Sequence, residues 1–125
     1  MQIRNMMKGC KNYHIGFRYA FAGIAWLLKK ERNMRVHCCA ALMVVVSGCI
    51  IGLSLYEWIA IILCIGAVLS AEAFNTAIER LANKVCPEYD EAIGNVKDMA
   101  AGAVLIVSIF SAITGAIILI SKLNI

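Results

Sequence analysis

Three long stretches without charge divide this chain into its expected elements. Val36 to Tyr56, Trp58 to Ala71 and Met99 to Ser121 contain no Asp, Glu, Lys or Arg. A helix needs roughly 20 apolar residues to span a bilayer, so these stretches predict transmembrane helices over about 36–55, 58–82 and 98–121. We therefore expect an all-α integral membrane protein, folded as a single domain over residues 1–125.

A shorter apolar pattern precedes the first span, over about 13–30. Phe17, Phe21, Ile24 and Leu28 recur at offsets 0, 4, 7 and 11, which is one stripe of a helix, while Lys11, Arg18 and Lys29 follow another line. This pattern predicts an amphipathic helix in the plane of the cytoplasmic interface. Such a helix is either a peripheral anchor only or a surface helix that also borders a substrate entrance.

The basic residues indicate the orientation of the chain. Eight of the twelve precede the first span, three lie around the loop between the second and third spans (Arg80, Lys84 and Lys97), and Lys122 alone follows the third. The positive-inside rule then places the N-terminus and that loop in the cytoplasm. The formal net charge of +4 comes with no nucleic-acid motif, so we expect membrane-surface and phosphate attraction and no nucleic-acid partner.

The composition agrees with this class. The hydrophobic fraction is 62% and the mean hydropathy is +0.79, well above those of an ordinary globular domain. The six cysteines form no CxxC pair and no Cys/His ligand spacing, so we expect them to be reduced and packed as small hydrophobes. The basic, polar N-terminus predicts no cleavable signal peptide.

Three polar residues interrupt the end of the second span. Glu72, Asn75 and Glu79 are separated by offsets of 3 and 7, which places them on one helical face. Glu72 lies about 21 Å along the helix from Trp58, where an ionised carboxylate is costly. It must therefore face the bundle interior or a polar cleft, or else be protonated and hydrogen-bonded to Asn75. Glu79 reaches the interface, where the alternative is a solvated acid paired with Arg80 or Lys84.

The loop that follows leads to two further candidates. Pro87 is expected to end the second helix, and PEYDEAIGN to form a loop with a turn at Gly94-Asn95 before Lys97-Asp98 opens the third span. Asp98 then suits a helix start. Lys97 beside a helix N-terminus makes a plausible phosphate site, the alternative being an interfacial anchor.

A charged junction, KKERNMRVH, precedes the first span. An acidic residue such as Glu31 is unusual there, because such junctions favour Lys and Arg. It is either a salt-bridge partner or a metal ligand. His37 is read as an interfacial residue, and the turn over Ser54 to Trp58 as a short aromatic connection that forces an antiparallel hairpin.

The candidate residues fit one kind of chemistry. Phosphoryl transfer needs a divalent metal on oxygen ligands, a cation on the phosphates and a group that orients the nucleophile. The expected cytoplasmic edge supplies such groups: Glu31, Glu72, Asn75, Glu79, Lys97 and Asp98. The chain has no Walker A sequence and no kinase-type GxGxxG, so these residues alone leave open a membrane enzyme or a carboxylate-coupled transporter.

Two motifs carry a resemblance to a known family. The pattern ExxNxAIE…EYxxxxxxxKDxAAGAVLI over Glu72 to Ile106, with ERNMRVH over Glu31 to His37, closely resembles the prokaryotic diacylglycerol kinase and undecaprenol kinase family, in its Gram-positive branch. The resemblance implies a small three-span membrane kinase with an N-terminal surface helix. It also implies a homotrimer whose active sites are shared between subunits.

The resemblance also implies roles for single residues. Glu72 matches the proposed general base on the lipid hydroxyl, and Glu31 and Glu79 match the carboxylates that hold Mg²⁺ on the ATP phosphates. Asn75 matches the polar residue beside them, Lys97 the phosphate-contacting lysine, and Asp98 its neighbour at the nucleotide site. Family members often carry Asp at the position of Asn83, which puts nucleotide preference in doubt.

The implied activity is phosphorylation of a lipid alcohol by ATP and Mg²⁺ at the cytoplasmic side of a bacterial cell membrane. The Gram-positive-like motif favours undecaprenol, giving undecaprenyl phosphate. Diacylglycerol, giving phosphatidic acid, is the alternative, and a small proton-coupled multidrug exporter is a distant one.

Overall fold

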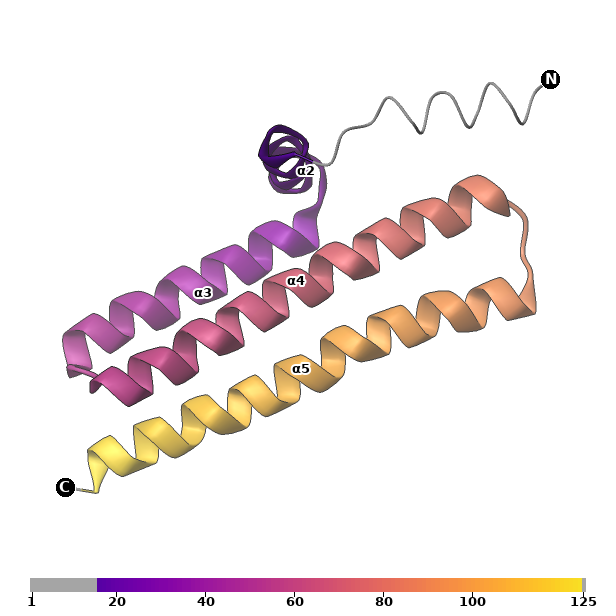
Figure 1. Cartoon of the computed structure of the whole chain (residues 1–125). Helices are drawn as coiled ribbons and strands as arrows, with labels where there is room; N and C mark the ends of the chain where they lie inside the picture. The colour runs from indigo at the N-terminus through magenta and orange to yellow at the C-terminus, as the bar shows by residue number, and fades with distance from the viewer. Residues whose placement is uncertain (1–15, 125) are drawn as a thin grey trace. The chain divides into compact units, whose positions relative to one another are not determined.

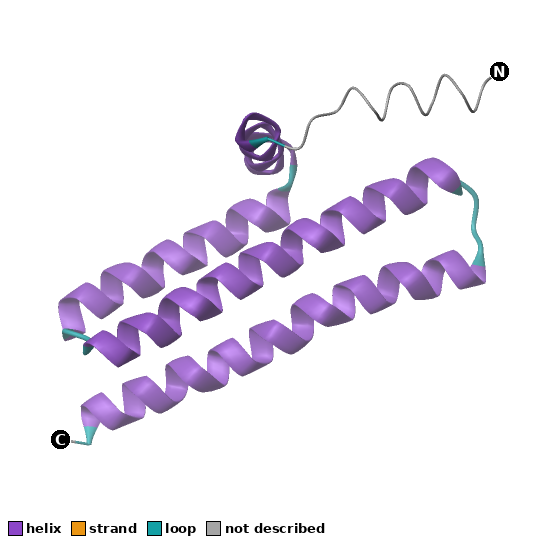
Figure 2. Ribbon diagram, viewed as in Figure 1, coloured by secondary structure: helices purple, strands orange, loops and turns teal. Residues whose placement is uncertain are grey.

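The computed structural model describes residues 16–124, and all regular secondary structure in this part of the chain is helical (Figures 1 and 2). Its helices are α2 (Phe17–Lys30), α3 (Arg32–Ile51), α4 (Leu55–Val85) and α5 (Glu91–Leu123). The chain divides after Lys30 into two compact units, so that α2 belongs to the first and α3 to α5 form the second. The expectation of an all-α chain with three long apolar helices is confirmed.

Helix α2 falls on the segment for which a surface helix is predicted. Its fourteen residues include Phe17, Phe21, Ile24 and Leu28, all of them exposed within the model. Residues 13–15 of the predicted helix lie outside the described residues. Its placement on a membrane surface stays a prediction.

Helices α3 and α4 form a tight hairpin. Gly52 ends α3 in the left-handed region (φ 81°), and its N–H donates to the Gly48 carbonyl; only glycine adopts this backbone without strain. Ser54 then begins α4 with a capping box, in which the Ser54 hydroxyl accepts from the Glu57 N–H and the Glu57 carboxylate accepts from the Ser54 N–H. The turn is therefore Gly52–Ser54, and the prediction of a first span to residue 55 and a turn over Ser54 to Trp58 was wrong.

The connection between α4 and α5 is shorter than expected. Helix α4 ends at Val85, just before Cys86 and Pro87, as predicted. Asp90 caps α5, its Oδ1 accepting from the Ile93 N–H at 3.0 Å. Because this cap starts the helix at Glu91, Gly94 and Asn95 lie within α5, and the predicted turn there and the predicted helix start at Lys97-Asp98 were wrong.

Helix α4 is the central element of the second unit. It packs against α3 on one side and, more extensively, against α5 on the other. The antiparallel register of α4 and α5 is marked at both ends, by a contact of Lys97 with Asn83 and by one of Lys122 with Glu57. The residue numbers of facing positions on α4 and α5 therefore add up to about 180.

The three helices differ in length. At about 1.5 Å per residue, α4 and α5, of 31 and 33 residues, are about 46 and 50 Å long, whereas α3, of 20 residues, is about 30 Å long. All three are long and apolar enough to cross a membrane. Few of their side chains are buried within the chain, and none of those of α5, as expected when lipid or another protein covers the apolar surface.

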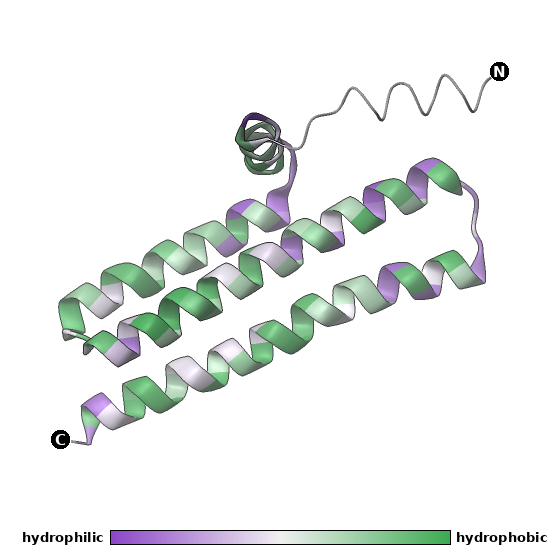
Figure 3. Ribbon diagram, viewed as in Figure 1, coloured by the Kyte–Doolittle hydropathy of each residue, from purple (hydrophilic) through white to green (hydrophobic). Residues whose placement is uncertain are grey.

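Polar residues gather at one end of this unit (Figure 3). There α3 begins, α4 ends and α5 begins, whereas apolar residues dominate the lengths of the helices. We call this the cavity end, because a polar cavity lies there. The opposite end, which carries Gly52–Ser54, Glu57 and Lys122, is called the hairpin end.

Candidate active site

A polar cavity of about 600 Å³ lies at the cavity end. Its volume is within the range of small-molecule sites. Glu31, at the N-cap of α3, contributes one side, and α4 contributes the rest; the lining residues are Glu31, Thr76, Glu79, Arg80, Asn83 and Lys84. The fold thus brings Glu31 and Glu79 to one cavity, although 48 positions separate them in the sequence.

Glu31 also has a cationic partner across the helices. Its Oε1 accepts from Arg80 Nε at 3.1 Å and makes an ion pair with Arg80 Nη2. The salt-bridge alternative for Glu31 is therefore present, with a partner from α4 rather than from the neighbouring junction. A carboxylate that faces the cavity can exchange its arginine partner for a metal ion, which would leave Arg80 to bind the phosphate.

Glu72 is placed deeper than the cavity. It is only 3% exposed, and Thr76, one turn closer to the cavity, is 4% exposed. Exposure rises along this face of α4, through the half-buried Asn75 to the exposed Glu79. The prediction that Glu72 faces the interior of the bundle is confirmed. Its ion-pair partner there is His37 of α3, whose Nε2 lies 3.6 Å from Glu72 Oε2.

Lys97 reaches the site from the second turn of α5. Its Nζ donates to the Asn83 side-chain oxygen at 2.7 Å, and Asn83 lines the cavity. The expectation that Lys97 and Asp98 stand at a helix N-terminus was wrong, because Asp90 starts α5 earlier. Backbone N–H groups at Lys97 are therefore inside the helix, and only its ammonium can serve a phosphate. Asn75, Lys97 and Asp98 lie outside the cavity lining itself.

The donor set suits a hard cation held jointly with a substrate. Among the described residues, no group of three or more His, Cys, Asp and Glu side chains is placed to hold a metal by itself. Two carboxylates, Glu31 and Glu79, nevertheless face one cavity. Mg²⁺ is commonly bound through one or two carboxylates together with substrate phosphates, so these residues fit it.

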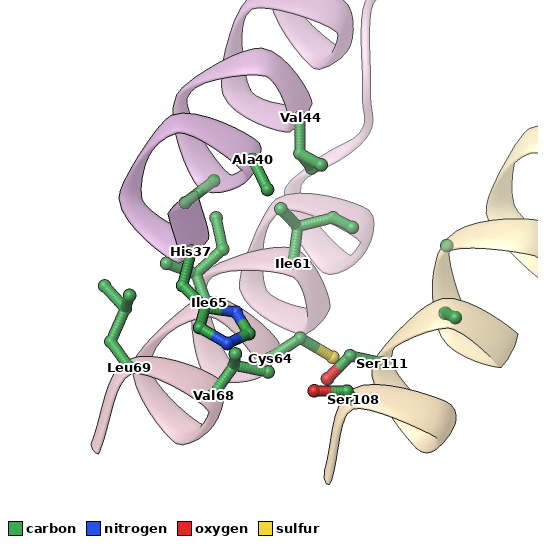
Figure 4. A pocket seen from close by; sticks show the side chains of 13 residues that line it. His37, Ala40, Val44, Ile61, Cys64, Ile65, Val68, Leu69, Ser108 and Ser111 are labelled. Carbon is green, nitrogen blue, oxygen red and sulfur yellow. The ribbon is translucent and has the colours of Figure 1, made fainter. Parts of the chain in front are cut away.

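A second, mainly apolar groove of about 350 Å³ runs between α3, α4 and α5 (Figure 4). His37, Cys64, Ser108 and Ser111 supply its polar atoms. Cys64 is one of five free cysteines in the described part of the chain: Cys38, Cys39, Cys49, Cys64 and Cys86. The expectation that the cysteines pack as small hydrophobes is not met within the chain by Cys39 and Cys49, which are exposed, and Cys10 lies outside the described residues.

The structure adds residues that the sequence reasoning had not assigned to the site. The sequence predicted an interfacial position for His37 and offered Arg80 as a partner of Glu79, whereas the structure pairs Arg80 with Glu31; Thr76 had no predicted role. The register of the α3–α4 hairpin is the signal that could have identified them. A turn centred near Leu53 places position 37 opposite about 69–72 and position 31 opposite about 75–80, which is where Glu72 and Arg80 lie.

Comparison with known proteins places the chain in a family. Residues 18–119 match the family model of prokaryotic diacylglycerol kinase. The chain is 37% identical over 107 residues to the undecaprenol kinase of Bacillus subtilis (strain 168), covering 86% of this chain and 87% of that protein. It is 31% identical over 121 residues to a diacylglycerol kinase of Synechocystis sp., covering 96% of this chain and 69% of the relative. With the diacylglycerol kinase of Escherichia coli (strain K12), it shares 33% identity over 103 residues, covering 81% and 83%.

These matches cover α2 to α5 almost entirely. They favour the enzyme over the exporter that the residues alone had left open. The chain belongs to the prokaryotic diacylglycerol kinase family, and it is a membrane-embedded lipid kinase.

Proposed function

We propose that this kinase transfers the γ-phosphoryl group of ATP to a lipid alcohol at the cytoplasmic interface, and that the alcohol is undecaprenol. One observation carries the proposal: a polar cavity that holds two carboxylates, Glu31 and Glu79, leads along one face of α4 to the buried Glu72. Nucleotide phosphates fit the polar cavity, and the hydroxyl group of a lipid fits the buried surroundings of Glu72.

The cavity is suited to the nucleotide. Glu31 and Glu79 would hold Mg²⁺, which neutralises charge on the phosphates when bound. Arg80 and Lys84 face the same cavity, and Lys97 is held at its border by Asn83. These cations would bind the phosphates and stabilise the negative charge that spreads over them during transfer. Asn75 and Asp98 are assigned to the same nucleotide site by their match to the family pattern.

Glu72 is suited to the lipid hydroxyl. Only an ionised carboxylate within hydrogen-bond reach can accept the proton of an attacking hydroxyl. Glu72 lies two turns below Glu79 on the same face of α4, so a hydroxyl at Glu72 and a phosphate at Glu79 would meet along the helix. Removal of water from this buried position strengthens each electrostatic contact and prevents hydrolysis of ATP.

The choice of undecaprenol rests on the comparisons and on one motif. The relative named undecaprenol kinase shares more identity with this chain than the two diacylglycerol kinases described above. The ERNMRVH motif, which forms the N-cap and first residues of α3, points to the same branch. Diacylglycerol is the competing acceptor, because the family model and several relatives carry that name.

The setting of the reaction follows from charge and exposure. Arg32, Arg35, Arg80, Lys84 and Lys97 all lie at the cavity end, which supports a cytoplasmic cavity. The exposed apolar side chains of α2 support its placement on the membrane surface. A homotrimer would cover part of the apolar surface that α3 and α5 leave exposed, and would allow residues of neighbouring subunits to complete the site.

The test is phosphate transfer from labelled ATP in mixed micelles, with undecaprenol and diacylglycerol offered separately and Glu72→Gln as the blank. Transfer mainly to undecaprenol supports the proposed acceptor. Transfer mainly to diacylglycerol assigns the chain to phospholipid turnover and shows that the ERNMRVH motif does not indicate the substrate. If neither lipid is labelled by a folded protein, the proposed reaction is wrong.

A further inference from the structure

His37 lies between the buried Glu72 and the apolar groove, and the proposed function gives it no role. On one side its Nε2 is 3.6 Å from Oε2 of Glu72, and on the other the imidazole lines the apolar groove between α3, α4 and α5 (Figure 4). The histidine side chain is 26% exposed, and that of Glu72 only 4%. At 3.6 Å the contact is longer than a hydrogen bond, and it becomes an ion pair when the imidazole carries a proton.

No other cation competes for Glu72 at this level of the three helices. Helix α5 has no ionisable side chain between Asp98 and Lys122, and its register places Ser108 opposite Glu72. On α4, the ionisable groups between Glu57 and Glu79 are Cys64 and Glu72 itself. On α3 they are His37 and the cysteines Cys38, Cys39 and Cys49, between Arg35 and the end of the helix.

The protonation state of this pair decides whether Glu72 can act as a base. With one proton shared between the two groups, the proton resides either on the carboxyl, giving two neutral side chains, or on the imidazole, giving an ion pair. Only the second state leaves a carboxylate that can accept a proton from a lipid hydroxyl.

We propose that His37 is a positioning residue of the kinase: its imidazole takes the shared proton and keeps Glu72 ionised and oriented toward the lipid hydroxyl. The proposal rests on the proposed function, because it assumes that Glu72 is the base. At acid pH a second proton enters the pair and neutralises Glu72, so activity falls.

The experiment uses the full-length protein in micelles and compares His37→Gln with His37→Lys. Glutamine keeps the size and polarity of the side chain but no charge, whereas lysine restores a cation. Val36→Ala, at the exposed neighbouring position of α3, controls for disturbance of the helix. The pH dependence of kcat, KM for ATP and the infrared band of a protonated carboxyl are measured for each; Glu72→Gln identifies the contribution of Glu72 to that band.

In His37→Gln we expect the acid limb of kcat to move to higher pH by about one unit, which is about a tenfold loss of turnover on that limb. KM for ATP should stay within about twofold, since the substitution leaves the nucleotide cavity intact. The Glu72 carboxyl band should appear at neutral pH in His37→Gln and be absent from His37→Lys and Val36→Ala.

Two results would overturn the inference. One is a pH profile and infrared spectrum of folded His37→Gln that superimpose on those of the unmodified protein. The other is a His37→Lys variant that behaves like His37→Gln, because charge would then not be the operative property. If Glu72→Gln retains turnover while the carboxyl band still responds to His37, the pairing is upheld and the base assignment in the proposed function is the part that fails.

Discussion

The two ends of the α4–α5 pair use lysine in different ways. At the hairpin end, Lys122 Nζ lies 2.9 Å from a carboxylate oxygen of Glu57, which also caps α4 through Ser54. At the cavity end, Lys97 Nζ lies 2.7 Å from the amide oxygen of Asn83. The geometry is similar, but the partner is an anion in one case and a neutral group in the other.

This difference separates a structural contact from a binding group. Glu57 neutralises Lys122, and the charge is then used to join two helices. Asn83 orients the Lys97 ammonium without cancelling its charge, which remains available to an anion at the cavity border. Four substitutions test this comparison, and two of them are paired with a matched position at the other end.

The largest effect is expected at Glu72. Glu72→Gln preserves size and hydrogen-bonding capacity but removes the basic group, so phosphate transfer should be abolished while ATP binding is retained. Turnover from labelled ATP, together with equilibrium nucleotide binding, measures both. Retention of more than a few per cent of activity would contradict the role of Glu72 as the base.

The next effect distinguishes the acids of the two ends. Glu79→Gln removes a cavity carboxylate and should raise the Mg²⁺ concentration for half-maximal activity by about tenfold or more, as expected for a lost metal ligand. Glu57→Gln, at the hairpin end, should leave the Mg²⁺ titration unchanged. Identical titrations for the two variants would show that Glu79 is not a ligand.

A smaller effect is expected for the two lysines. Lys97→Met should raise KM for ATP by about tenfold, corresponding to the loss of one charged contact to phosphate. Lys122→Met removes the same charge from the other end of α5 and should leave KM unchanged. Steady-state kinetics at saturating lipid provide the comparison, and a similar rise in both variants would mean that the two ends do not differ as described.

The smallest effect on activity is expected at the hairpin. A Cβ on Gly48 would lie 2.8 Å from the Trp58 ring and 2.9 Å from Leu53, so Gly48→Ala should destabilise the fold by about 1–3 kcal/mol through overpacking. Turnover per folded molecule should be unchanged, because the site lies at the other end. Thermal unfolding in micelles measures the loss of stability. Turnover normalised to the concentration of active sites measures the activity per folded molecule.

The sequence was sufficient to predict the helices but not all their limits. Runs without charge identified α3, α4 and α5, because insertion in lipid imposes a strong compositional demand. The limits depend on single capping residues. Ser54 with Glu57, and Asp90 three residues before Ile93, set the starts of α4 and α5, and both starts had been placed too late by following hydropathy alone.

The site was predictable where it lies within one helix. Glu72, Asn75 and Glu79 share a face by spacing alone, and the burial of Glu72 follows from the cost of a carboxylate in apolar surroundings. Contacts between helices were not accessible in the same way. The pairs Glu31–Arg80 and His37–Glu72 depend on the exact length of the Gly52–Ser54 turn, which shifts the register of every residue on α3.

The unequal helix lengths make the thickness of the host bilayer a variable of the reaction. Helix α3, at about 30 Å, matches the hydrocarbon layer of a typical membrane, whereas α4 and α5 are longer by about three to four turns. A thicker layer would draw more of α4 into lipid and lower Glu72 relative to the headgroups, while a thinner one would raise it toward water. The acyl-chain length of the surrounding lipids would then regulate this kinase without binding to any site on it.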